Sequence, residues 1–80
     1  MTDETAERLA QHLQTANAEL ARAVGLAKDE CSAEEFELWR ERLAAVMGAL
    51  LIEVLDPLYR ERPYLAPNAL RDQYPLRPSG

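Results

Sequence analysis

The chain has few of the residues that build sheets, disulfides or catalytic sites. Its 80 residues include one cysteine, one histidine, one tryptophan, one phenylalanine and three glycines. A single cysteine cannot form a disulfide within the chain, which favours a reducing, cytoplasmic location. Alanine and leucine are abundant and β-branched residues are few, a composition that favours helices over strands. Proline is absent before position 57, so no proline interrupts helices in that part of the chain.

Long apolar runs and an excess of positive charge are also missing. The longest apolar run, residues 43–52, has about half the length that a transmembrane helix needs. The N-terminal residues are acidic and lack the basic start and apolar centre of a signal peptide. The net charge of −5 argues against nucleic acid or an anionic membrane as a partner. We therefore expect a cytoplasmic protein without membrane association.

No motif for catalysis, cofactor binding or metal binding occurs in the sequence. Phosphate-binding glycine loops, nucleophile elbows and metal-spaced Cys/His clusters are absent. His12 is expected beside an apolar helix seam, Cys31 at the turn between two helices, and Glu53 on a solvated helix edge. An intersubunit disulfide through Cys31 and a buried acid at Glu53 are the alternatives. We predict a protein that is not an enzyme, with no catalytic, cofactor-binding or metal-binding residue.

Apolar residues recur at helical spacing over two segments, about 3–29 and 33–56. The second segment begins with S-A-E-E, a capping box in which the Ser32 and Glu35 side chains bond each other's backbone N–H groups. Few residues separate the segments, which predicts an antiparallel two-helix hairpin. In the first segment, a narrow seam with spacings of four and three comprises Leu9, Leu13, Ala16, Leu20, Ala23 and Ala27. In the second, the residues at helical spacing are Phe36, Trp39, Leu43, Val46 or Met47, Leu50 and Val54.

The second half of the later helix is apolar on nearly all sides. On a helical wheel with about 100° per residue, Gly48, Ile52 and Leu55 fall on the side away from Leu50. The narrow seam of the first helix can cover only one side. A lone two-helix hairpin also buries too little apolar surface to offset its chain entropy. We therefore predict an all-α protein in which two copies complete a dimeric four-helix bundle.

All five prolines and all three tyrosines lie after residue 56. Residues 1–56 hold twelve acidic and five basic residues, whereas residues 57–80 hold two acidic and four basic ones. Pro57 either kinks the second helix or begins a new turn with Asp56 as its N-cap. We predict a hairpin body over residues 1–62 and an extension over 63–80 with one or two short helical turns. This extension packs on the body or on a partner, since disordered tails rarely carry so many aromatic and apolar residues.

The sequence suggests a small protein–protein interaction module, a regulator, inhibitor or assembly subunit that acts as a helical-hairpin homodimer. A nucleic-acid-associated regulator using the basic tail is the first alternative, and a small all-α enzyme is the second. A heterologous protein partner is compatible with the leading hypothesis. Tyrosine and arginine interleaved with proline are typical of contact surfaces. The predicted interaction residues are Gly48, Ile52, Leu55, Tyr59, Arg60, Arg62, Tyr64, Leu65, Leu70, Arg71 and Tyr74.

Overall fold

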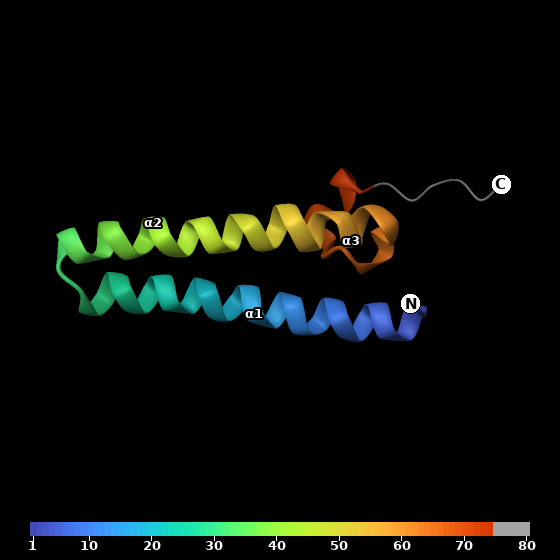
Figure 1. Cartoon of the computed structure of the whole chain (residues 1–80), viewed down its shortest axis with the longest axis horizontal. Coiled ribbons are helices and arrows are strands. Elements are labelled where there is room, and N and C mark those ends of the chain that lie inside the picture. Colours follow the sequence, from blue (N-terminus) through green and yellow to red (C-terminus); the bar gives the residue numbers. More distant parts are fainter. Residues whose placement is uncertain (75–80) are drawn as a thin grey trace.

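The computed structural model describes residues 1–74, and in this part of the chain every element is helical and no strand occurs (Figure 1). This confirms the all-α prediction. The elements are α1 (Asp3–Glu30), α2 (Ala33–Leu50), a π-helical segment (Leu51–Leu55), α3 (Asp56–Glu61) and two 3₁₀ turns (Pro63–Leu65 and Asn68–Gln73). Among these elements, no helix is both long and apolar enough to cross a membrane.

Side-chain caps fix the limits of the two long helices. Thr2 caps the start of α1 by accepting a hydrogen bond from the Thr5 N–H at 3.1 Å. At the other end the Cys31 N–H donates to the Ala27 carbonyl at 3.0 Å. Ser32 and Glu35 form the predicted capping box, so α2 starts directly after the turn. With only two residues between them, α1 and α2 run antiparallel and side by side (Figure 1).

The face of α1 that meets α2 is rotated from the predicted seam. Leu9 and Ala16, both predicted to face the second helix, are exposed. The structure instead turns Ala10 and Asn17 inward, one position later in the sequence in each case. The buried and half-buried line along α1 is Ala6, Ala10, Leu13, Asn17, Leu20, Val24 and Ala27. The prediction was wrong for Leu9 and Ala16 because two overlapping seven-residue repeats exist on α1, and α2 lies closer to the later one.

A π-helical turn changes the phase of the second helix before it reaches α3. The Asp56 N–H donates to the Leu51 carbonyl, five residues earlier instead of four. One extra residue in a turn rotates all that follows by about 100° relative to a regular helix. Leu55 therefore points toward α1 and is buried, with Leu13 packed against its cluster. The wheel had placed Leu55 on the far side, which was wrong because it assumed an unbroken α-helix.

Pro57 explains where this irregular turn occurs. In a regular helix its ring would clash with the carbonyl of residue 53, and it has no N–H to donate. The π turn ends at Leu55, and α3 follows at Asp56 with Pro57 in its first turn. Asp56 does not act as the N-cap of α3, as had been predicted. Leu55, which precedes α3, has helical conformation, and no side chain caps the start of α3. The helical path is thus continuous from α2 into α3.

The core lies at one end of an elongated molecule. The principal-axis extents are 55 × 22 × 19 Å. Residues 63–74 fold back over α3 and the N-terminal half of α1, so the termini-proximal end is several layers thick (Figure 1). The buried cluster comprises Leu55, Tyr59, Ala66 and Tyr74, with Leu13, Leu50, Leu65 and Leu70 packed against it. In contrast, α2 contains no buried residue.

Candidate interaction surfaces

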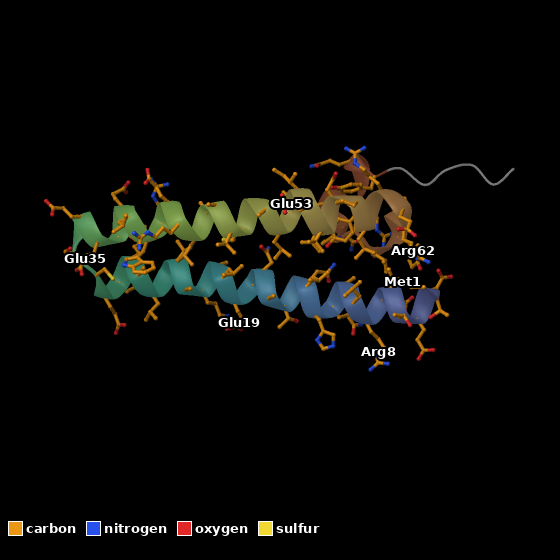
Figure 2. The ribbon with its side chains drawn as sticks, in the orientation of Figure 1. Met1, Arg8, Glu19, Glu35, Glu53 and Arg62 are labelled. Atoms are coloured by element: carbon orange, nitrogen blue, oxygen red, sulfur yellow. The ribbon has the colours of Figure 1, made fainter. Side chains whose placement is uncertain are left out.

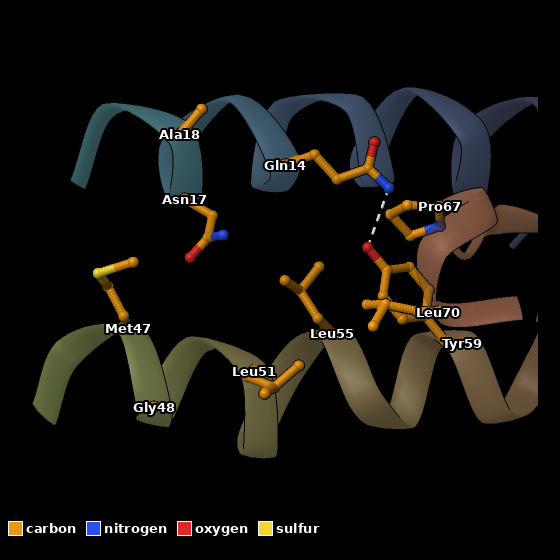
Figure 3. Close-up of a pocket in the computed structure, with 10 residues that line it drawn as sticks. All are labelled: Gln14, Asn17, Ala18, Met47, Gly48, Leu51, Leu55, Tyr59, Pro67 and Leu70. Carbon is orange, nitrogen blue, oxygen red and sulfur yellow. Dashed lines mark hydrogen bonds between the residues drawn. The ribbon is translucent and has the colours of Figure 1, made fainter. Parts of the chain in front are cut away.

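Tyr59 is the central residue of the packed end, with 1% of its surface exposed. Gln14 on α1 donates to the Tyr59 hydroxyl at 2.9 Å (Figure 3). It also donates to the Leu65 carbonyl at 3.2 Å. One amide group therefore connects α1, α3 and the first 3₁₀ turn. The Tyr59 ring also meets the ring of Tyr74 edge to face, with centroids 5.4 Å apart.

Asp56 connects the last described residue to the helix end. The Tyr74 hydroxyl donates to Asp56 at 2.6 Å, and the Arg60 Nε donates to its other carboxylate oxygen at 2.8 Å. These two donors, the tyrosine first, hold the pKa of Asp56 below its ordinary value. The same hydrogen bond and burial raise the pKa of Tyr74. The hydrogen bond from Tyr74 to Asp56 thus holds residue 74 against the start of α3.

Arg62 and Arg71 form hydrogen bonds with other residues of the same chain. Arg62 donates to Asp3 at 3.3 Å and to the Met1 carbonyl at 2.8 Å, so it ties α3 to the N-terminus (Figure 2). Arg71 donates to the backbone carbonyls of Tyr64 and Ala66, both at 3.0 Å, and braces the turn between them. Both arginines were predicted to contact a partner. Their bonds within the chain are an additional, structural role.

Two side chains from the end of α3 and the segment after it, Arg62 and Tyr64, interact with Asp3. The Tyr64 hydroxyl and then the Arg62 guanidinium, which donates to Asp3 at 3.3 Å, lower the pKa of Asp3. Desolvation, followed by the hydrogen bond to Asp3, raises the pKa of Tyr64. The N-terminal turn of α1 and the tail are therefore linked at a second point, separate from the Asp56 contacts.

The eleven predicted interaction residues fall into three groups by exposure. The buried ones are Leu55, Tyr59 and Tyr74; the half-buried ones are Gly48, Arg62, Leu65 and Leu70; the exposed ones are Ile52, Arg60, Tyr64 and Arg71. Among the apolar members Ile52 is the most accessible, at 70%. Most of the set therefore lies around the packed end, and the exposed members surround it rather than forming one patch on α2.

A groove of about 540 Å³ runs along one side of the helix pair, and we call it the Gly48 groove (Figure 3). Its lining is Gln14, Asn17, Ala18, Met47, Gly48, Leu51, Leu55, Tyr59, Pro67 and Leu70. Gly48 leaves space in the wall, since a Cβ atom built there meets nothing within 4 Å. The walls are aliphatic apart from the Gln14 and Asn17 amides and the Tyr59 hydroxyl. Such a surface fits an apolar side chain with one polar group, and it carries no charged side chain.

A second apolar surface, which we call the Trp39 face, consists of Leu9, Ala16, Ala23, Leu26, Trp39 and Val46. Leu26 is 59% exposed, Val46 53% and Trp39 45%. The Arg42 guanidinium lies 4.9 Å from the centroid of the Trp39 ring and covers part of the ring. Trp39 was predicted to face a core, and in the single chain it does not. The predicted seam of α1 contained Leu9, Ala16 and Ala23, so the sequence did signal half of this face.

The residues considered for chemistry remain apart from one another. His12 and Glu53 are exposed and Cys31 is half-buried at the end of α1. Among residues 1–74, no group of three or more His, Cys, Asp or Glu side chains is arranged to hold a metal ion. The same residues contain no buried side-chain polar atom without a hydrogen-bond partner.

Comparisons with models of known protein families, with curated proteins and with solved structures found no match.

Proposed function

We propose that this protein is a non-enzymatic interaction module that works as a helical-hairpin homodimer, a dimeric four-helix bundle in which each copy supplies two helices. One observation carries the proposal: large apolar side chains such as Leu26, Trp39 and Val46 stay exposed along both helices, although the packed end has a buried cluster around Tyr59. A surface with several exposed large apolar residues on adjacent helices marks an association site. The acidic body matches this role, because net charge keeps such a protein soluble apart from its specific contacts.

The Gly48 groove supplies a site for a heterologous protein partner. It lies on the flank of the helix pair opposite to the Trp39 face, so dimerisation through that face leaves it open. An amphipathic helix or a loop with one large apolar residue fits its uncharged walls. This arrangement would let the homodimer present two equivalent grooves, which is typical of regulators and assembly subunits.

Light scattering over a concentration series tests the dimer. We expect a mass of twice 9.0 kDa at micromolar concentration. A mass of 9.0 kDa up to several hundred micromolar would contradict the homodimer.

Affinity capture from the host tests the groove. A Leu51→Glu variant places a charge on the lining, and Ile52→Glu, its neighbour outside the lining, is the matched control. Proteins that bind the wild type and the Ile52→Glu variant but not the Leu51→Glu variant would be partners of the groove. Equal capture by both variants would show that partners bind elsewhere.

A further inference from the structure

We propose that a second copy of this chain docks on the Trp39 face, in an antiparallel orientation that sets the turn of each copy against the tail end of the other. This rests on the proposed function and specifies the surface and the orientation that the homodimer uses.

The two helices carry the Trp39 face on the same side. On α1, Leu9, Ala16 and Ala23 recur every seven residues and so follow one line along the helix. On α2, Trp39 and Val46 have the same spacing. Ala23, Leu26 and Trp39 line one shared hollow of about 340 Å³ beside the turn, so the two lines lie next to each other. Two adjacent heptad lines form the kind of seam into which side chains of a second hairpin interdigitate.

The size of this face fits a second copy. Helix α1 has 28 residues and is about 42 Å long at about 1.5 Å per residue. The molecule is 22 Å wide, so the side of the helix pair that carries the Trp39 face has an outline of roughly 900 Å². A stable interface buries about 800 Å² on each partner. An identical hairpin matches this length and width along its whole body, and a twofold axis at the centre of the face covers it on both copies.

Charge selects the antiparallel orientation. The turn end is strongly acidic, because between residues 28 and 39 the only basic residue is Lys28. The acidic residues in this interval are Asp29, Glu30, Glu34, Glu35 and Glu37. The opposite end, far from Glu35, is nearly neutral (Figure 2). Its four arginines and the amino terminus offset all but one of the six acidic residues in 1–10 and 56–74. Placing two turns together would oppose two strongly acidic ends, whereas the antiparallel arrangement brings each acidic turn to an end that is nearly neutral.

Two matched variants test which face the second copy uses. Val46→Glu puts a charge in the centre of the Trp39 face, and Ile52→Glu puts one at a 70% exposed position outside that face. We expect the Val46→Glu variant to dimerise at least about 100-fold more weakly, since an unpaired charge in an apolar interface is unfavourable. Ile52→Glu should dimerise like the wild type. Circular dichroism controls for folding, because position 46 is exposed in the single chain and the Val46→Glu monomer should keep its helical signal.

The outcomes separate this inference from the proposed function. If Val46→Glu stays dimeric, or if Ile52→Glu alone dissociates the dimer, the Trp39 face is wrong although the homodimer stands. If the wild type is monomeric throughout, the proposed function fails as well.

The single cysteine reports the orientation. With a twofold axis near Val46, each Cys31 lies about 22 Å from the axis along the helix, so the two are about 45 Å apart. A nitroxide on Cys31 of the full chain should give a spin–spin distance near 45 Å in the dimer. A distance under about 30 Å would place the two turns together and overturn the antiparallel orientation.

Discussion

The two ends of this molecule use the same pair of helices and reach different degrees of burial. At the tail end, Tyr59 is 1% exposed and the chain folds back to cover it. At the turn end, Trp39 is 45% exposed although it is the larger aromatic residue. Two helices alone cannot enclose a bulky side chain, because each offers only one flank. A third layer closes the tail end, and residues 1–74 provide no such layer at the turn end.

The comparison is tested most strongly by removing one aromatic side chain from each end. Tyr59→Ala removes a fully buried ring and its bond from Gln14, so we expect a loss of about 3–5 kcal/mol in the free energy of unfolding. Trp39→Ala, measured at a concentration where the chain is monomeric, should lose about 1 kcal/mol or less, because its ring is largely solvated already. Urea unfolding followed by circular dichroism measures both. Equal losses in the monomer would remove the distinction between the ends.

At the turn end, the capping box of Ser32 and Glu35 stabilises the start of α2. Ser32→Ala removes the acceptor for the Glu35 N–H and should lower the free energy of unfolding by about 1 kcal/mol. Hydrogen exchange should speed up in the first turn of α2 and stay unchanged around Tyr59. Faster exchange at the tail end as well would show that the two ends unfold as one cooperative unit.

A smaller change with the opposite sign is expected at Gly25. This exposed glycine lies inside α1, and a Cβ atom added there meets nothing within 4 Å. Gly25→Ala should therefore raise the free energy of unfolding by about 0.5–1 kcal/mol, through the lower entropy of the unfolded chain. Thermal unfolding checks this. A decrease in stability would mean that position 25 is covered in the dimer.

The smallest effect concerns the dependence of stability on pH, and its alkaline limb arises at the tail end. The pKa of Asp56 is lowered by Tyr74 and Arg60, so its contribution is present above the ordinary value of 3.8 and is lost as pH falls below it. The pKa of Tyr74 is raised, so its contribution is present below 10.0 and is lost as pH rises through the raised value. Tyr74→Phe should flatten both limbs of the stability–pH curve, while Ser32→Ala leaves the alkaline limb unchanged. An unaltered curve in Tyr74→Phe would contradict the Asp56 link.

Local patterns predicted the elements of the fold better than their relative phase. The capping box at Ser32 and the helical spacing of the apolar residues depend on neighbours within a few positions, and the structure has both. The direction of Leu55 depends on a π turn that Pro57 causes, and a wheel that assumes regular geometry misses such a turn. The exposure of Leu9 depends on which of two overlapping repeats α2 contacts, a choice made by packing along the entire helix pair. The bond from Gln14 to Tyr59 joins residues 45 positions apart, and no local pattern signals it.

The π turn also has a consequence for insertions and deletions. Because it holds one residue more than an α turn, a deletion of one residue within 51–55 could convert it to a regular turn without shortening the hydrogen-bonded helix elsewhere. Such a deletion would preserve composition and helix content almost entirely. It would also keep the positions of Leu58 and Tyr59 relative to α1. The proline at position 57, however, would then lose the wider π turn that accommodates its ring. Along these two helices, residues 51–55 are therefore the segment where the number of residues in a turn, and not the identity of a side chain, determines which residues contact α1.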